Sequence, residues 1–357
     1  MVSTEEVIWA YRLILGREPE SEAVVNQATA CESVGALVRR FISSDEYRVR
    51  RFSERSFGAV GDRLDEIRTY INKGSTGIEI GPWFNPICPK REGYATLVLD
   101  VFDQAELVAR AKADPGIDDE MVGRIEPVDI VGSVSEMDEL LSARNLAGTL
   151  DYVVSSHNFE HVPDPVRFLR ACQSVLNATG ILSMAVPDRR TCFDHFRPYS
   201  TTGEIIEAFW ARRSKPSPAQ IFSHVAFHAK NHIAGENRIG WGLASTPAHV
   251  SLHDTITNAY DIAHRHLVNK DEAYFDTHCW TFSPRSLELI IMDLNALNLI
   301  DMAVRKIIYH GGHEFYIHIE KSEYKLDPNS VEFREKRSEL LRQVVDENAE
   351  HVRTFGL

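Results

Sequence analysis

Apolar and polar positions alternate between residues 77 and 186 in a way that predicts strands and helices in turn. Short runs of β-branched and other apolar residues, each closed by a small or acidic residue, are typical of buried strands. We expect such strands at 77–81, 95–100, 128–131, 150–155 and 181–186, with Gly180 closing the helix before the last one. Helical patterns at 103–112 and 165–176 lie between them. This spacing predicts an α/β fold with a doubly wound, mainly parallel sheet.

The pattern changes after the fifth predicted strand. Residues 189–276 are rich in histidine and aromatic side chains and are expected to be mostly helical. An insertion at this point lies over the carboxyl edge of the sheet, where ligands of such folds bind, so we expect an acceptor lid. A helix at 286–297 and two strands at 302–308 and 314–319 follow, and the sequence HGGH between the strands predicts an antiparallel hairpin. A charged helix is expected at 330–354.

The N-terminal 50 residues predict short helices, with Val7, Tyr11 and Ile14 on one face. The stretch TEEVIWAYRLILGREPE resembles a small helical module with a YxxxLGRxPD signature, which is appended to many bacterial proteins of surface and glycan biology. The resemblance implies docking or oligomerisation, and a helical cap on the main domain is the alternative. We expect a module at 1–56, a main domain at 57–325 that starts with a helix at 57–74 and includes the lid at 189–276, and a C-terminal helix at 326–357.

The composition of the chain argues against several classes of binding partner. The chain of 357 residues has a formal charge of −13 and no cluster of lysine and arginine, which argues against binding to nucleic acid or anionic membranes. Its five cysteines are scattered, with no CxxC pair, and therefore predict reduced thiols rather than a disulfide framework. No apolar run approaches about 18 residues, so no membrane span is expected. A cytoplasmic protein is the simplest expectation.

The segment 77–100 carries the first chemical signal. A strand ending at Gly81 and a second strand ending at Asp100 are arranged as a nucleoside cofactor requires. The backbone can approach the cofactor closely at the glycine, and the acid can accept hydrogen bonds from ribose hydroxyls. The glycine run is incomplete, because Pro82, Trp83 and Phe84 follow Gly81.

Residues 150–190 carry the second signal. The sequence SSHNFEHVPDP follows one strand and VPDRR follows the next. This arrangement resembles the class I S-adenosylmethionine-dependent methyltransferases, in particular a type 11-like bacterial branch with the pattern sHxxEHVpDP … avPDrr.tFD..R. The first motif of that branch is often GIEIGPxxxP, which matches residues 77–86, and HCWTFS at 278–283 resembles its HxHxWt element. The resemblance covers about 77–320 and implies a Rossmann-like, seven-stranded sheet with an antiparallel last strand.

The resemblance implies S-adenosylmethionine as cofactor and assigns residues to it. Glu79 and Gly81, with Pro82 beside them, would hold the methionine end. Asp100 would bind the ribose, although a charge at a helix N-terminus is the alternative. Ser133 and Val134 would lie along the adenine, and Ser155 would offer its carbonyl to the ammonium group.

The acceptor site is expected where the lid meets the sheet. Methyl transfer is an in-line displacement, and an alcohol needs a base or a metal to take its proton. His157 is the preferred base, with a structural histidine as the alternative, and Asp188 and His278 are further catalytic candidates. Residues expected to contact the acceptor are Asn158, Arg189, Asp194 and Arg197, unless the charged ones pair with each other and order the lid.

The spacing of three histidines decides whether they could bind one metal ion together. His224, His228 and His232 recur every four residues, which on a helix would align them along one face. The first and third would lie about 12 Å apart at the helical rise of 1.5 Å per residue, too far to share one ion. We therefore assign no metal ligands, and metal-assisted deprotonation remains an alternative.

The sequence thus predicts an S-adenosylmethionine-dependent methyltransferase that O-methylates a hydroxyl of a sugar or glycan precursor. An N-methyltransferase acting on a small molecule or peptide is one alternative. A non-catalytic scaffold with the same fold is another. The expected partner is a small-molecule or glycan acceptor, and a homo-oligomer is compatible with the N-terminal module.

Overall fold

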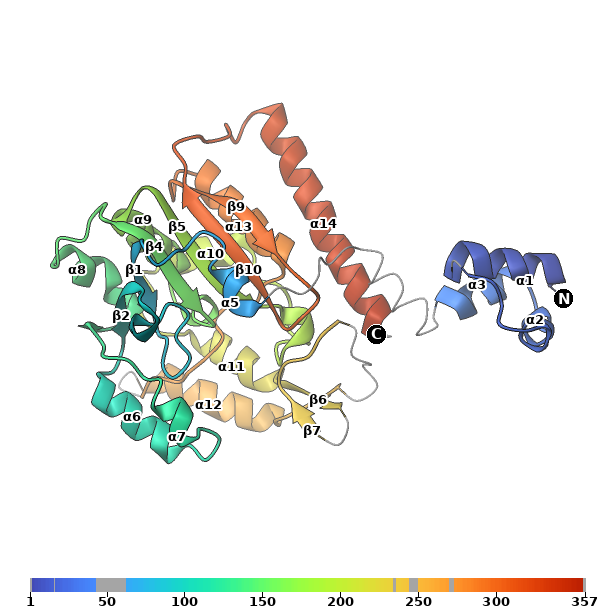
Figure 1. Ribbon diagram of the computed structural model, residues 1–357, viewed down its shortest axis with the longest axis horizontal. Coiled ribbons are helices and arrows are strands. Elements are labelled where there is room, and N and C mark those ends of the chain that lie inside the picture. The colour runs from blue at the N-terminus through green and yellow to red at the C-terminus, as the bar shows by residue number, and fades with distance from the viewer. Residues whose placement is uncertain are drawn as a thin grey trace. The chain divides into compact units, whose positions relative to one another are not determined.

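The computed structural model describes residues 2–15, 17–42, 62–233, 236–243, 250–269 and 273–355 (Figure 1). Contacts divide the chain into two compact units, residues 1–60 with 244–246, and residues 61–243 with 247–357. The first unit contains the short helices α1 (Thr4–Ala10), α2 (Glu22–Thr29) and α3 (Val34–Ile42), with a π-helical turn at Tyr11–Leu15. Its core includes Val7, Tyr11, Leu37 and Phe41. The likeness of this unit to the YxxxLGRxPD module stays a prediction.

A seven-stranded sheet organises the second unit, in the order β3-β2-β1-β4-β5-β10-β9. Its strands are β1 (Thr76–Ile80), β2 (Ala95–Asp100), β3 (Ile130–Val131), β4 (Leu150–Ser156), β5 (Leu176–Pro187), β9 (Met302–Ile308) and β10 (Glu314–Lys321). The first five are parallel, whereas β10 runs antiparallel to both β5 and β9. The predicted Rossmann-like α/β fold with its antiparallel last strand is confirmed.

Helices cover this sheet and bury a core of aliphatic and aromatic side chains. The described helices of this unit are α5 (Arg63–Ile67), α6 (Gln104–Ala113), α7 (Asp119–Val122), α8 (Met137–Ser142), α9 (Pro165–Val175), α10 (Thr202–Trp210), α11 (Pro218–Ala226), α12 (Ile256–Val268), α13 (Pro284–Ala296) and α14 (Val331–Phe355). Of these, α8, α9, α10 and α13 supply side chains to that core. Several begin as their sequence dictates. The Asp164 side chain accepts the backbone N–H of Arg167 at the start of α9, and Pro165 occupies the first turn.

The start of β5 differs from the prediction. We expected Gly180 to close the preceding helix, but α9 ends at Val175 and Gly180 lies inside β5. A Cβ atom at Gly180 would lie 2.9 Å from the Leu176 side chain and 3.0 Å from the Leu150 carbonyl oxygen. The pairing register with β4 shifts at the same place. The glycine is therefore required by close packing between strands rather than by a helix end.

The helix expected at 57–74 is also shorter than predicted. Residues 57–61 lie outside the described residues, and α5 spans only Arg63–Ile67. The Asp62 side chain accepts the backbone N–H of Leu64, which defines the start of α5. The chain then turns before β1.

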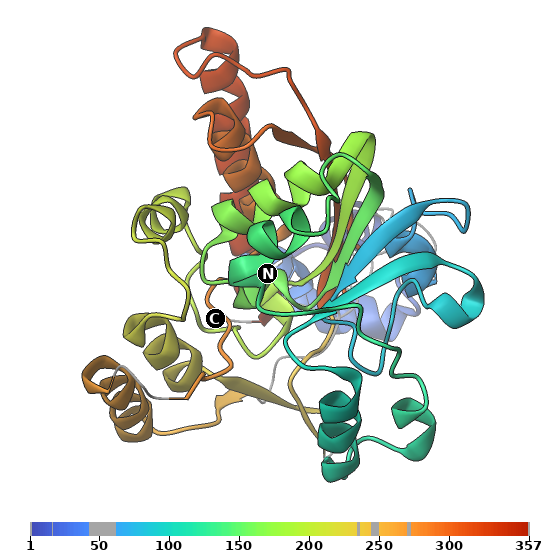
Figure 2. The same cartoon turned by 90° about the vertical axis from the view of Figure 1, so that its left-hand side faces the viewer.

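The insertion after β5 is not mostly helical. It contains α10, α11 and α12, and also a small antiparallel sheet of β6 (Ala229–Ile233), β7 (Glu236–Arg238) and β8 (Val250–Leu252). In the views of Figures 1 and 2, α11, α12 and the small sheet lie along one end of the large sheet, whereas α10 packs against α9 and α13. The idea of a histidine row on one helix is wrong, because α11 ends at Ala226 and His232 belongs to β6.

Candidate active site

A cavity of about 370 Å³ lies at the carboxyl ends of β1 and β4. Its lining residues are Arg63, Glu79, Ile80, Gly81, Pro82, Trp83, Phe84, Asn85, Ser156, His157 and His313. Because β1 and β4 are parallel and Ile80 pairs with Ser155, both strands deliver their following residues to the same edge. This edge is where doubly wound sheets bind ligands.

The turn after β1 forms one wall of the cavity. Gly81 has φ +62°, and its backbone N–H donates to the carbonyl of Leu99 on β2. Only glycine adopts this conformation at little steric cost, so the bare backbone faces the cavity. Trp83 and Phe84 pack edge to face, with ring centroids 4.9 Å apart, and the Trp83 indole donates to the Leu107 carbonyl. Aromatic side chains therefore line the cavity where further glycines are usual.

Glu79 is buried beneath this turn and is tied to the following loop. Its Oε1 accepts the backbone N–H of Ile87 at 2.5 Å, and its Oε2 accepts that of Cys88 at 2.9 Å. Burial raises the pKa of Glu79 to about 7, against the effect of these two hydrogen bonds. A carboxylate oxygen has a second lone pair, so Glu79 can hold the loop and still accept from a ligand ammonium group.

The predicted ribose and adenine residues follow the neighbouring strands. Asp100 ends β2, is 7% exposed, and accepts the backbone N–H of Phe102 at 3.3 Å. Burial raises its pKa. Because Asp100 pairs with Val131, Ser133 and Val134 lie at the same sheet edge. None of these three lines the cavity, and neither does Ser155, whose buried hydroxyl lacks a hydrogen-bond partner.

His157 stands at the cavity with an unusual backbone. Its φ is +49°, and its N–H donates to the Ala185 carbonyl on β5. Its Nε2 lies 2.7 Å from Oε2 of Glu314. Burial opposes the charged imidazolium, but the hydrogen bond to Glu314 and the charge of Glu160 together raise the pKa of His157. The strained, positive φ is required to aim this ring at the first residue of β10.

Glu314 also binds Arg63. Arg63 Nε lies 2.6 Å from Glu314 Oε1, and Arg63 Nη2 donates to the Ser156 hydroxyl at 2.7 Å. The Tyr316 hydroxyl donates to the same carboxylate. Although burial would raise the pKa of Glu314, His157 and Arg63 hold it well below its usual range. Sequence reasoning missed both Arg63 and Glu314, because each lies far along the chain from the motifs and belongs to none of them.

A second polar group lies on the other side of His157, around Glu160. Glu160 is fully buried, and among the described residues neither of its carboxylate oxygens has a hydrogen-bond partner. Nitrogen atoms of His157, His161 and His278 each lie 3.7 Å from its Oε1.

Two further carboxylates position these histidines. His278 Nδ1 lies 2.5 Å from Asp194 Oδ2, and His161 Nδ1 lies 2.8 Å from Asp276 Oδ1. Arg197 donates to the other oxygen of Asp194 at 2.6 Å and to the carbonyl of His278. Arg197 and His278 hold the pKa of Asp194 well below its usual range, against the effect of burial. Asp194 and Arg197, predicted to contact the acceptor, are brought together to hold His278.

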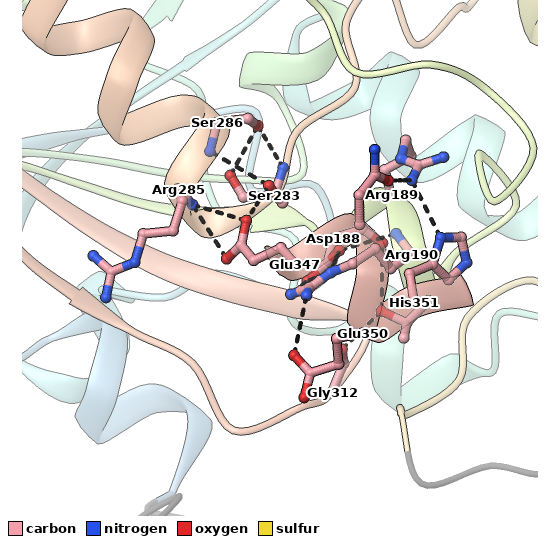
Figure 3. A network of polar contacts seen from close by, with 12 residues as sticks. Asp188, Arg189, Arg190, Ser283, Arg285, Ser286, Gly312, Glu347, Glu350 and His351 are labelled. Carbon is pink, nitrogen blue, oxygen red and sulfur yellow. Dashed lines mark hydrogen bonds and ion pairs between the residues drawn. The ribbon is translucent and has the colours of Figure 1, made fainter. Parts of the chain in front are cut away.

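Asp188 does not reach the cavity. It is fully buried, and its two oxygens accept from Nε and Nη2 of Arg190 at 2.9 and 2.6 Å (Figure 3). Arg190 also lies 3.9 Å from Glu350 of α14. Asp188 therefore faces Arg190 and not the cavity, and a catalytic role for it stays a prediction.

Arg189 is occupied in the same region. Its guanidinium donates to the carbonyls of His195 and Arg197 and to the side chain of Asn348 on α14. It also stacks over the ring of Tyr199, 4.2 Å from the centroid. Arg189 therefore joins α14 to the start of the insertion, and its contact with an acceptor stays a prediction.

Asn158 remains at the edge of the cofactor cavity. Its side-chain amide lies against the Gly81 turn, where a Cβ on the glycine would be 3.4 Å from Asn158 Nδ2. Its buried Oδ1 has no hydrogen-bond partner in the part of the chain that the structure describes. This free acceptor keeps Asn158 a candidate for contact with a ligand.

Comparison with protein families identifies the class of this chain. A family model described as a methyltransferase domain matches residues 52–296, which is more than half of the chain. The chain therefore belongs to the methyltransferase domain family and is an enzyme of that class. Its methyl donor is S-adenosylmethionine.

Among curated proteins nothing matches the chain. Solved structures with a similar fold include a protein of Pyrococcus horikoshii with 13% identity, covering 79% of this chain and 93% of that one, at a TM-score of 0.37. They also include an S-adenosylmethionine-dependent methyltransferase of Mesorhizobium loti with 11% identity, covering 73% and 99%, at a TM-score of 0.35. The methyltransferase CcbJ of Streptomyces caelestis has 11% identity, with 74% and 98% covered, and a TM-score of 0.34.

The residues present fit the methyl donor. A cavity of about 370 Å³ is within the range of small-ligand sites. The open backbone at Gly81 admits the polar methionine end, and the carboxylate of Asp100 keeps acceptor capacity for ribose hydroxyls. The five cysteines are all free thiols, as expected. Among the described residues, no helix has both the length and the apolar character needed to cross a membrane.

Proposed function

We propose that this enzyme transfers a methyl group from S-adenosylmethionine to a hydroxyl of a small polar acceptor, with a sugar or glycan precursor as the expected class. The observation that carries the proposal is the His157–Glu314 pair beside the cofactor cavity, with His157 Nε2 2.7 Å from the carboxylate. An alcohol needs a base before it attacks, whereas a neutral amine does not.

The donor supplies an electrophilic methyl group on a sulfonium. Glu314 accepts the Nε2 proton of His157 and fixes the tautomer in which Nδ1 is a free base. His157 Nδ1 takes the hydroxyl proton as the acceptor oxygen forms its bond to the methyl carbon. The carbon–sulfur bond breaks at the same time and its electron pair returns to sulfur. Trp83, Phe84 and Pro82 exclude water from one side of this path.

The cofactor residues keep the roles that the resemblance implies. Glu79 and Gly81 hold the methionine end, Asp100 binds the ribose, and Ser133 and Val134 flank the adenine. Ser155 offers its backbone carbonyl to the ammonium group, and Asn158 contacts the acceptor side. Polar side chains around the cavity, including Arg63, Asn85 and His313, suit a hydroxylated acceptor. The glycan class rests on the N-terminal sequence TEEVIWAYRLILGREPE, and a cytoplasmic enzyme acting on a soluble precursor is consistent with it.

A screen with methyl-labelled S-adenosylmethionine tests the proposal. Sugar nucleotides and free sugars form one arm, and primary and secondary amines form the other. We expect label on oxygen, a loss of at least 100-fold in kcat/KM for His157→Asn, and no loss for His264→Asn on the exposed face of α12. Label found only on nitrogen, with activity that survives His157→Asn, would replace the proposal by N-methylation.

A further inference from the structure

We propose that Glu160, His161 and His278 form a site for one divalent transition-metal ion, with Zn²⁺ as the best fit. The ligand atoms of the three residues lie within 4.8 Å of one another. Both histidines direct Nε2 to Glu160 Oε1, at 3.7 Å in each case. Four ligands about 2.1 Å from a tetrahedral zinc ion lie about 3.4 Å apart, so the two distances of 3.7 Å need only a small contraction, and the two histidine nitrogens lie within 4.8 Å of each other.

The state of Glu160 is the strongest argument. A fully buried carboxylate with no hydrogen-bond partner on either oxygen is costly, and such groups are normally paired or bound to a metal. Here the atoms that face it are imidazole nitrogens at 3.7 Å, too far for hydrogen bonds. A cation between them satisfies the carboxylate and both nitrogens together.

The outer contacts are those of a metal centre. Metal-binding histidines usually place their other ring nitrogen against a carboxylate, which fixes the tautomer and orients the ring. His278 has Asp194 at 2.5 Å, and His161 has Asp276 at 2.8 Å. In each ring the carboxylate lies beside Nδ1, within hydrogen-bond geometry for His278 and at ion-pair distance only for His161, which leaves Nε2 as the ligand atom.

The backbone holds these ligands in place. Glu160 and His161 belong to the turn Phe159–His161, and the segment with His278 is joined to it by hydrogen bonds. The Trp280 N–H donates to the Glu160 carbonyl at 3.1 Å, and the Trp280 indole donates to the Val162 carbonyl at 2.6 Å. Two segments separated by more than 100 residues are therefore locked together at the ligands.

A neighbouring cluster of two histidines and a glutamate is less suited to a metal ion than this site. His157, His313 and Glu314 also lie within 4.8 Å of one another. Their carboxylate, however, is already bound by Arg63 and Tyr316. A cation is less favourable beside a bound guanidinium, so this cluster is a hydrogen-bonded dyad and not a metal site.

A metal at this place also deepens the proposed function, on which this step rests. His157 joins the two groups, because its Nε2 contacts Glu314 and its Nδ1 lies 3.7 Å from Glu160 Oε1. Three protein ligands leave a zinc ion with an open position. An acceptor hydroxyl bound there would have its pKa lowered beside the base that takes its proton.

The test measures metal binding directly, on the full chain stripped with a chelator. We expect Zn²⁺ to bind at about one ion per chain, and Co²⁺ to give the visible absorption of a low-symmetry nitrogen and oxygen site. His278→Gln and Glu160→Gln should weaken Zn²⁺ binding at least 100-fold, and His264→Asn should leave it unchanged. Wild-type protein that takes up less than 0.1 ion per chain would overturn the proposal.

Asp276→Asn keeps the test independent of folding, because the Asp276 side chain is 77% exposed. It should weaken Zn²⁺ binding about 10- to 100-fold without changing the melting temperature of the metal-free chain. Zinc affinity that is equal in Asp276→Asn, His278→Gln and wild type would mean adventitious binding elsewhere. Zinc bound without O-methylation would refute only the proposed function, O-methylation by protein that does not bind zinc would refute only the metal site, and O-methylation that persists after zinc is removed would refute only the part of the ion in the reaction.

Discussion

His157 Nε2 lies 2.7 Å from Glu314 Oε2, although 157 residues separate the two in the chain. Strand β5 makes this contact possible. The His157 N–H donates to Ala185 of β5, and Glu314 pairs with Pro187 at the end of the same strand. The base and its carboxylate are therefore positioned by one central strand rather than by a flexible loop.

This pair predicts a characteristic pH profile. A base must be unprotonated, so kcat/KM should rise with pH and level off above the raised pKa of His157, which lies above the usual 6.5. Glu314→Gln removes the negative charge that stabilises the imidazolium. Its midpoint should move to lower pH, with a reduced plateau, as measured by initial rates with labelled donor. A midpoint that does not move would mean that another group limits the rate.

Asp100→Ala tests the cofactor site. Loss of a charged acceptor for ribose hydroxyls should weaken S-adenosylmethionine binding about 10- to 100-fold in calorimetric titration. Asp119→Ala, at an exposed position in the first turn of α7, serves as the matched control and should bind normally. Equal affinities of the two variants for S-adenosylmethionine would mean that Asp100 does not bind the ribose.

Asp188→Asn tests whether Asp188 acts in the structure or in catalysis. The substitution leaves Arg190 as a buried charge without its counter-ion, which should lower the free energy of unfolding by about 3–5 kcal/mol in urea titration. Glu106→Gln, which breaks the exposed pair with Arg110, should cost about 0.5 kcal/mol or less. Folded Asp188→Asn protein should bind S-adenosylmethionine like wild type, whereas normal stability with lost turnover would support a catalytic role.

Glu347 lies on α14, where its carboxylate accepts the hydroxyl of Ser283 (Figure 3). We expect it to make the stability of the protein depend on pH. Burial raises its pKa to about 7 in the folded protein, above the usual 4.5. The folded state therefore binds more protons between these values, and the contribution of Glu347 to stability falls as pH rises from about 4.5 to 7. The free energy of unfolding should be measured between pH 5 and 8. Its decline over this range should be smaller by about 1–3 kcal/mol in Glu347→Gln than in wild type. Glu332→Gln, exposed on α14, should follow the wild-type curve.

Much of the fold could be predicted because strand periodicity and strand ends are local properties. Gly81, Asp100 and His157 were placed correctly at one sheet edge, since parallel strands bring their carboxyl ends together. Gly180 was misplaced because a glycine after a helical pattern predicts a helix end as readily as a tight strand contact. The β6–β7–β8 sheet was missed because its strands are three to five residues long.

The site was predictable only in part, because the sequence does not show which group a charged residue contacts in the folded protein. Asp188, Arg189 and Arg190 follow a strand, where they can face either a ligand or each other. The structure pairs Asp188 with Arg190, two positions along the chain, and uses Arg189 to hold Asn348 of α14, which lies 159 positions away. Glu314 had no motif of its own, and its role follows only from antiparallel pairing with β5.

The position of β10 has a consequence for synthesis. This strand lies between β5 and β9, and it brings Glu314 to a base that is made 157 residues earlier. Chains emerge from the ribosome N-terminus first, so β1, β2 and β4 are available long before β10. The edge of β5 is left unpaired during that interval and invites pairing with other chains. Nascent chains stalled between residues 190 and 310 expose this unpaired edge of β5. They are therefore the species that most require a chaperone to prevent aggregation.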